Sequence, residues 1–277
     1  MTSMIDTALG PIAYDLRVAR PGAPDLPPLV LLPSGGHDHH DFDELRERLA
    51  DVTTLAIDWP AQGGSPALAT GPASAMRFAD VAEELVARLA PAGVIVAGNS
   101  VGGFAAARLA IRRPDLVRGL AVIDGGGFSG RSPATRAFCT LMGRPRALRA
   151  IYPIFTAAYM RARTDADRRA RATALATTHD DASLRGLGEL WRSFASPEHD
   201  LRGRAGEIAA PTVLIWGRHD PVIPLRVGRR AQRLIPGSRL VVLDTGHVPH
   251  TSDPDGVAQA LHELFAEVAA PTTATAA

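Results

Sequence analysis

The sequence predicts an α/β fold with a mostly parallel sheet, helices on both faces of that sheet, and one helical insertion. Three observations support this prediction. Short continuous runs of Val, Ile and Leu end in turn residues, as strands buried on both faces do. Helix-length segments follow these runs, and strands that alternate with helices form parallel sheets through right-handed crossovers. One long segment has no such run and contains only helix-like patterns.

Six apolar runs are expected to form the parallel strands. They lie at residues 28–32, 54–58, 93–97, 119–123, 211–216 and 239–243. Helices are expected to follow them, most clearly at residues 41–50, 75–89 and 101–113. Residues 11–19 alternate more regularly between apolar and polar side chains, which favours an antiparallel edge strand.

The segment from Phe128 to Ser196 interrupts the alternation of strands and helices. We expect a helical cap over residues 126–196, inserted after the strand that ends near Ile123. The core is then made of residues 1–125 and 197–268. Residues 269–277 contain only Ala, Thr and Pro and are expected to form a disordered tail.

Composition argues against several classes of function. The 277 residues carry a formal net charge of +1, with thirty Arg and no Lys, so there is no basic footprint for nucleic acid or an anionic membrane. The single cysteine, Cys139, rules out an internal disulfide, and the first ten residues do not resemble a signal peptide. No apolar run reaches the ~18 residues of a membrane span. We expect a cytoplasmic protein that acts on a small molecule; its oligomeric state stays open.

The turn after the third apolar run carries the strongest chemical signal. Residues 98–103 read GNSVGG, which matches G-x-S-x-G between a strand and a helix. In that context a tight, strained turn lifts the Ser100 hydroxyl above the strand ends, and only glycine fits at Gly98 and Gly102. The helix that starts at Val101 directs free N–H groups at the same place. Ser100 is therefore the candidate nucleophile; the alternative is a glycine-rich turn that only packs.

A serine nucleophile needs a base, and His247 is the first candidate. It lies in the sequence TGHVP, just after the run at 239–243, so it should emerge at the same sheet edge as Ser100. His250, three residues further on, is the alternative.

The base in turn needs an acid that orients it. Asp220 follows the run at 211–216 and is the first candidate, because the chain order Ser, Asp, His is the one expected for such a fold. Asp124, at the end of the run at 119–123, is the alternative acid. Asp244 is interpreted as a strand-end or turn residue.

The oxyanion of an acyl-transfer reaction needs preorganised N–H donors. We expect one from Val101, the residue after the nucleophile. The second is expected from the glycine-rich loop after the first apolar run, at Gly35 or Gly36, which the sequence does not separate. The alternative is that this loop is only a tight turn.

Two further motifs are weighed and set aside. Residues 125–130 spell G-x-G-x-x-G after a strand, but no acidic residue follows about 20 positions later, as a dinucleotide site requires. Residues 37–42, HDHHDF, fall one ligand short of a zinc-hydrolase motif, because Phe42 stands where the last histidine would be. These polar residues are instead expected to cap the next helix or to line the pocket mouth. No cofactor and no metal are expected.

The expected cap carries an excess of positive charge. Residues 126–200 contain twelve Arg against seven Asp and Glu. One hypothesis is that a cap arginine binds an acidic or electron-rich part of the substrate, with Arg192 beside Trp191 as the first candidate and Arg161 or Arg163 as others. The alternative is a solvated helix face. Asn99, Trp191 and Arg192 are thus candidate substrate-binding residues.

Taken together, these motifs resemble the capped α/β-hydrolase superfamily over residues 10–268. The matching segments, in order, are LLPSGG, DWPAQGGS, GNSVGG, WGRHDPVIP and DTGHVPH. The chain departs from the family at Pro33-Ser34-Gly35, where a His-Gly pair is usual. GNSVGG is similar to meta-cleavage C–C bond hydrolases, although Val248 replaces the aromatic residue that follows their histidine.

The resemblance implies a serine hydrolase that forms an acyl-enzyme on a small carboxylic ester, lactone or thioester. A C–C bond hydrolase of a β-diketone-like substrate is the alternative within the same fold. A hydrolase-fold protein that only binds its ligand, or acts on it without hydrolysis, is a different class. Burst release of a chromogenic acyl ester distinguishes the enzyme from the binder, which gives none.

Overall fold

The computed structural model describes residues 2–270 and contains one eight-stranded sheet in the order β1-β2-β4-β3-β5-β6-β7-β8. β3 through β8 pair in parallel, and β1 and β2 are antiparallel additions at one edge. This confirms the predicted fold class. The strands are β1 (Thr2–Thr7), β2 (Gly10–Arg17), β3 (Leu29–Leu32), β4 (Thr54–Ile57), β5 (Val94–Asn99), β6 (Val117–Ile123), β7 (Thr212–Gly217) and β8 (Arg239–Leu243).

All six predicted parallel strands are present, and the antiparallel strand predicted at residues 11–19 is present as β2. β2 is not the edge of the sheet, because it pairs with β1 on one side and β4 on the other. β1 was not predicted, because in this outermost strand only Ile5 is buried and no apolar run marks it. The residues of β8 are only half-buried, since this strand forms the opposite edge of the sheet.

Helices cover both faces of the sheet. They are α1 (Asp43–Arg48), α2 (Ala75–Leu89), α3 (Val101–Arg112), α8 (Leu225–Leu234), α9 (Pro249–Ser252) and α10 (Pro254–Ala269), with short 3-10 turns η1 (His39–Phe42), η2 (Pro197–His199) and η3 (Ala205–Glu207). The predicted helix at 41–50 is thus divided between η1 and α1. α10 extends to Ala269, the first residue of the predicted tail, and residues 271–277 lie outside the described part of the chain.

Alternate side chains of each strand enter two separate cores, as the two-residue period of a strand requires. In β3, Val30 and Leu32 pack with α2, α3 and α8, whereas Leu29 and Leu31 pack with α1 and α10. The same alternation recurs in β7. Continuous apolar runs are therefore the direct result of a sheet that is covered on both faces.

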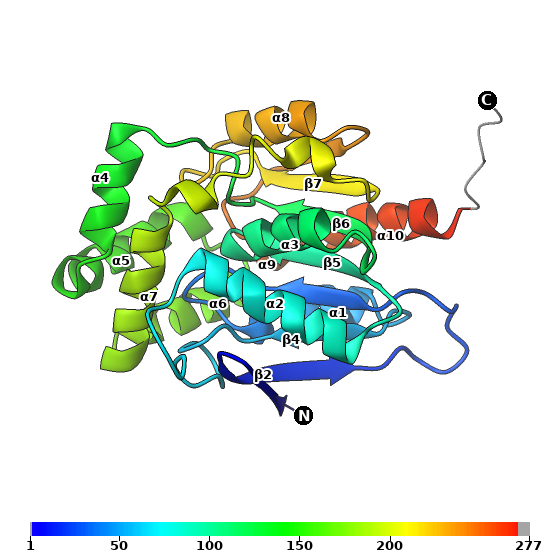
Figure 1. Ribbon diagram of the computed structural model, residues 1–277, viewed down its shortest axis with the longest axis horizontal. Coiled ribbons are helices and arrows are strands. Elements are labelled where there is room, and N and C mark those ends of the chain that lie inside the picture. The colour runs from blue at the N-terminus through cyan, green and yellow to red at the C-terminus, as the bar shows by residue number, and fades with distance from the viewer. Residues whose placement is uncertain (1, 271–277) are drawn as a thin grey trace.

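Four helices form the insertion between β6 and β7. They are α4 (Pro133–Met142), α5 (Pro145–Met160), α6 (Asp165–Ala176) and α7 (Asp181–Ser193). Figure 1 shows α4, α5 and α7 grouped beyond one end of the sheet. Because β3, β5, β6, β7 and β8 are parallel, the loops that follow them meet at one edge, and cap residues of α5 and α7 line the same cavity as Ser100 and His247 from these loops. Among the described residues no helix is both long and apolar enough to cross a membrane.

Candidate active site

The backbone of Ser100 is strained in the way that the GNSVGG motif predicts. Its φ of 57° and ψ of −114° lie in a region that residues with a side chain rarely adopt. A Cβ atom on Gly98 would collide with the carbonyl of Gly102, and one on Gly102 would collide with the carbonyl of Leu32. Only glycine fits on either side, so β5 can turn sharply into α3 and leave the Ser100 side chain in the wall of a cavity.

Hydrogen bonds to β6 and to the loop after it hold the main chain of this turn in place. The Ser100 amide donates to the Ile123 carbonyl at 3.0 Å, and the Gly126 amide donates to the Ser100 carbonyl at 2.8 Å. The strain at Ser100 is therefore fixed by the loop after β6.

His247 and Asp220 form a buried, hydrogen-bonded pair. Nδ1 of His247 lies 2.6 Å from Oδ2 of Asp220, and the other carboxylate oxygen accepts from the amides of Val222 and Ile223 at 2.7 and 3.1 Å. With Nδ1 engaged in this way, Nε2 is the ring nitrogen that remains for chemistry. His247 lines the same cavity as Ser100.

The main chain of His247 is held on both sides as well. Its amide donates to the Tyr159 carbonyl at 2.8 Å, and its carbonyl accepts from the Asn99 side chain at 2.9 Å. Asn99 is fully buried and also donates to the Ile123 carbonyl at 3.0 Å. The structure therefore places Asn99 in the scaffold that joins the serine and histidine loops. It does not line the cavity, contrary to the hypothesis that it contacts substrate.

Asp124 lies beside Asp220 but is bonded differently. It is fully buried, and its two carboxyl oxygens lie 3.0 and 3.1 Å from the amide nitrogen of Gly217. Burial, reinforced by the nearby charge of Asp220, raises the pKa of Asp124 well above its usual range. No hydrogen bond from Asp124 to His247 is present among the described residues.

Asp124, Asp220 and His247 are also a group of potential metal ligands among residues 2–270, with ligand atoms within 4.8 Å of one another. The structure uses His247 Nδ1 and Asp220 Oδ2 in the hydrogen bond that joins them. A metal ion would have to break that bond, so the donor set fits an acid–base pair better than a metal centre.

In the loop after β3, the structure distinguishes the two candidate oxyanion donors, Gly35 and Gly36. The Gly36 amide donates to Oε1 of Gln62 at 2.9 Å, and Gly36 does not line the cavity. Gly36 is therefore not a free donor, which corrects that half of the prediction. Gly35 and Val101 both line the cavity, and neither amide has a hydrogen-bond acceptor among the described residues.

The cavity has a volume of about 430 Å³ and two kinds of wall. The cap contributes an aromatic wall of Phe138, Tyr152, Phe155, Tyr159, Trp191 and Phe194. Trp191 packs edge-on against its phenylalanine neighbours at centroid distances of 5.4 to 5.6 Å. Polar side chains gather elsewhere in the lining, namely Ser129, Arg131, Thr135, Ser196, His199 and Asp200.

The arginine candidates lie outside this cavity. The guanidinium of Arg192 donates to the Gly143 carbonyl at 2.7 Å, which turns it away from the cavity that Trp191 lines. Arg161 and Arg163 line a separate depression next to Asp244. Arg131, which no sequence pattern singled out, is the cap arginine of the cavity lining; it is exposed and donates to the Ala195 carbonyl at 3.2 Å.

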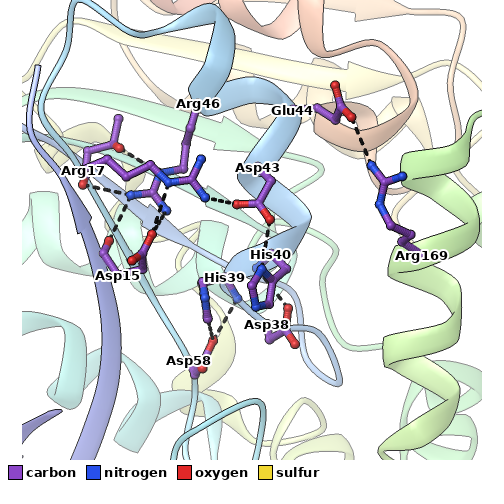
Figure 2. Close-up of polar contacts among 11 residues, drawn as sticks. Asp15, Arg17, Asp38, His39, His40, Asp43, Glu44, Arg46, Asp58 and Arg169 are labelled. Atoms are coloured by element: carbon purple, nitrogen blue, oxygen red, sulfur yellow. Dashed lines mark hydrogen bonds and ion pairs between the residues drawn. The ribbon is translucent and has the colours of Figure 1, made fainter. Parts of the chain in front are cut away.

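The HDHHDF segment does not assemble a metal centre. As Figure 2 shows, His39 binds Asp58 and His40 binds Asp43, with Nδ1 to carboxylate distances of 2.8 and 2.9 Å. The Asp38 side chain accepts from the His40 amide and caps η1, as expected for a residue that starts a helix. The His39 and His40 rings lie 4.0 Å apart, but each binds its own carboxylate through Nδ1.

His37, the first residue of that segment, connects the cap to the loop after β3. Its Nδ1 lies 2.5 Å from Asp41 and its Nε2 lies 2.8 Å from the Tyr159 hydroxyl. Tyr159 is buried in the cap, and the hydroxyl of nearby Tyr152 donates to the Gly35 carbonyl at 3.5 Å. Thr177 adds another cap contact by donating to the Gly36 carbonyl at 3.1 Å. No sequence pattern indicates the contacts of His37 with Tyr159 and of Gly36 with Thr177, because the two partners of each contact are far apart along the chain.

His250, the alternative base, is fully buried away from the cavity and stacks on Phe42 at 4.5 Å. Neither of its ring nitrogens has a hydrogen-bond partner among the described residues. Burial lowers the pKa of His250 to about 4, so the ring is neutral in the folded protein.

This burial predicts a loss of stability in acid. Unfolded chains protonate this histidine near pH 6.5 but the folded protein resists until about pH 4, so stability falls as pH drops through that window. His250→Phe should reduce the difference in the free energy of unfolding between pH 8 and pH 5 by about 2 kcal/mol, at ~1.4 kcal/mol for each pH unit below 6.5. Urea unfolding of both proteins at the two pH values measures this. Equal pH dependence in the two proteins would contradict it.

The chain is similar to known proteins of one family. A model described as "Alpha/beta hydrolase family" matches residues 29–260. The pimeloyl-[acyl-carrier protein] methyl ester esterase of Neisseria meningitidis serogroup B (strain MC58) is 30% identical over 263 residues, which cover 90% of this chain and 96% of the relative. The 2-hydroxy-6-oxononadienedioate/2-hydroxy-6-oxononatrienedioate hydrolase of Klebsiella pneumoniae is 30% identical over 210 residues, 72% of this chain and 71% of the relative. The enol-lactonase structure from Burkholderia xenovorans LB400 matches with a TM-score of 0.78 at 22% identity, covering 94% of this chain and 99% of that one, and shows the shared fold.

Proposed function

Because the chain belongs to the alpha/beta hydrolase family, we propose that it hydrolyses a small carboxylic ester, lactone or thioester through an acyl-enzyme on Ser100. One observation carries the proposal. Strained Ser100 and His247 line the same cavity, and His247 is hydrogen-bonded through Nδ1 to buried Asp220. A protein that only binds its ligand has no need of this arrangement.

In the first step the Ser100 hydroxyl oxygen attacks the carbonyl carbon of the ester. Nε2 of His247 takes the hydroxyl proton, and the electron pair of the carbonyl bond moves to its oxygen. The amides of Val101 and Gly35 donate to that oxyanion. Asp220 holds the imidazole through Nδ1, which leaves Nε2 to act on Ser100, and stabilises the imidazolium that forms.

In the second step the tetrahedral intermediate collapses. His247 gives its proton to the leaving alcohol or thiol, and an acyl-enzyme remains on Ser100. Water then loses a proton to His247 and attacks the acyl carbon. The bond to Ser100 breaks, its oxygen takes the proton back, and the carboxylic acid leaves.

The aromatic wall of the cavity favours an apolar acyl group. Each buried methylene contributes about 0.8 kcal/mol, or roughly fourfold in kcat/KM. For p-nitrophenyl esters from acetate to hexanoate, we therefore expect kcat/KM to rise about threefold to fourfold with each added methylene. Trp191→Ala should flatten this series, since it removes part of the wall. Arg192→Gln, which changes the next residue outside the cavity, should keep the slope. A series that declines from acetate onward would exclude an acyl site against this wall.

Pre-steady-state kinetics test the acyl-enzyme itself. A burst of p-nitrophenol equal to the enzyme concentration, followed by slower turnover, is the expected result when deacylation is slow. Labelled substrate acid recovered on Ser100 by mass spectrometry would identify the attachment site. Absence of any turnover across the ester, lactone and thioester series would overturn the proposed function.

The second candidate is hydrolysis of a C–C bond next to a ketone. It is favoured by the similarity to the Klebsiella pneumoniae hydrolase and by the GNSVGG motif. Val248, fully buried after the histidine, counts against it. A vinylogous dione substrate assayed beside the ester series decides between the two. Ester hydrolysis predicts the higher kcat/KM on an ester, and C–C bond hydrolysis predicts the higher kcat/KM on the dione.

A further inference from the structure

One buried polar atom in the cavity wall has no partner within the protein. Several buried side-chain nitrogen and oxygen atoms lack a hydrogen-bond partner among the described residues, and of the residues that carry them only His199 lines the cavity of Ser100. The atom is Nε2 of the imidazole. Buried polar atoms almost always have a partner, and an unsatisfied one in a binding cavity marks a place where a ligand atom belongs.

The position of His199 is well defined. The residue ends η2, and its ring packs against Phe104 and Phe194 at centroid distances of 4.5 and 5.0 Å. Its Nε2 lies 3.0 Å from the point that a Cβ on Gly126 would occupy. A side chain at Gly126 would lie against this nitrogen, and both residues line the cavity.

Gly126 also places His199 close to the reacting centre. The Gly126 amide donates to the Ser100 carbonyl at 2.8 Å, so the two residues are in direct contact. In the sheet, β5 with Ser100 lies between β3, whose loop holds Gly35, and β6, whose loop holds Gly126. His199 thus lies on the β6 side of Ser100, whereas the proposed oxyanion donor Gly35 lies on the β3 side.

The imidazole at this position is uncharged. Burial lowers the pKa of His199 to about 4, and the neighbouring Asp200 offsets this only in part. A neutral imidazole has one N–H donor and one acceptor nitrogen. It can accept from a hydroxyl or donate to a carbonyl, but it offers no positive charge to a carboxylate.

We propose that His199 is a specificity-determining residue that hydrogen-bonds an uncharged hydroxyl or carbonyl substituent of the substrate near the scissile bond. The proposal rests on the ester hydrolysis proposed for Ser100 and narrows its substrate class to hydroxy- or oxo-acid esters. An analogue that lacks the substituent leaves the buried nitrogen unpaired, and enzymes discriminate strongly against such analogues.

Four ethyl esters test the proposal: butanoate, 2-hydroxybutanoate, 3-hydroxybutanoate and 3-oxobutanoate. For the wild type we expect kcat/KM of at least one substituted ester to exceed that of butanoate by about tenfold. His199→Phe keeps an aromatic ring against Phe104 but removes both nitrogens, so the preference should fall to about one. His199→Gln restores a polar atom at similar reach and should recover part of it. A preferred 3-oxo-ester identifies the nitrogen as a donor, and a preferred 3-hydroxy-ester without any preference for the 3-oxo-ester identifies it as an acceptor.

His250→Phe is the matched control, because it removes the other buried, unpartnered histidine without touching the cavity, and it should keep the wild-type preference. Two outcomes overturn the proposal: no substituted ester is preferred by the wild type, or His199→Phe lowers kcat/KM equally for all four esters. Calorimetric binding of the same esters to Ser100→Ala, with and without His199→Phe, needs no turnover. If the wild type hydrolyses none of them, the proposed function fails, and the binding preference still decides the role of His199.

Discussion

Ser100→Ala is expected to lower kcat for the preferred ester by at least about a thousandfold while the protein still folds and binds that ester. The substitution removes the attacking oxygen, and no other hydroxyl can take its place at the strained turn after β5. The amides of Val101 and Gly35 remain, so some stabilisation of the oxyanion persists and accounts for the residual rate. The substitution should leave the backbone strain at φ 57° nearly unchanged, because alanine retains the Cβ atom that causes it.

Steady-state and burst kinetics measure this effect. Ser238→Ala is the control. Ser238 does not line the cavity and donates to the Ile235 carbonyl, so this variant should retain wild-type kcat. Circular dichroism and calorimetric ester binding establish that the Ser100 variant is folded. Residual activity above about a thousandth of wild type would sink the covalent mechanism.

Asp220→Asn is expected to lower kcat by about a thousandfold or more with a small change in KM. An amide can present its N–H to Nδ1 of His247, which favours the tautomer whose Nε2 carries the proton and cannot act as a base. The substitution also removes the charge that stabilises the imidazolium. The main chain of His247 remains held by Tyr159 and Asn99, so the loop itself should stay in place.

Asp124→Asn is the matched comparison and should cost less than about tenfold. Burial and the charge of Asp220 raise the pKa of the Asp124 carboxyl, which accepts from the Gly217 amide and contacts Asp220. An amide reproduces this pattern, because its oxygen can accept from Gly217 and its N–H can donate to Asp220. Measuring kcat and KM for both variants on one ester decides the assignment. If Asp124→Asn is the more damaging change, then the acid of the reaction comes from the end of β6.

The sequence by itself determined the layered fold and where its polar residues emerge. Apolar runs covered by helices on both faces could only be parallel strands, and the C-terminal ends of parallel strands meet at one edge. Ser100, Asp220 and His247 each follow such a run, so their common edge was predictable without coordinates. The glycines around Ser100 were predictable for the same local reason, since the collisions they avoid involve the turn itself and the adjacent strand.

Tertiary structure alone decided the choices among near neighbours. Gly35 and Gly36 are adjacent in a turn, and only the distant Gln62, by accepting from Gly36, distinguishes them. Trp191 and Arg192 are consecutive on α7, and the rotation of that helix directs one into the cavity and the other to Gly143.

The same holds for His199, which a remote segment brings to the cavity, and for the contact between His37 and Tyr159, which joins segments far apart along the chain. Local patterns record which face of an element is apolar, because burial repeats with the period of that element. A single polar contact between remote segments leaves no periodic trace, so the cap side of the cavity had to be seen in three dimensions.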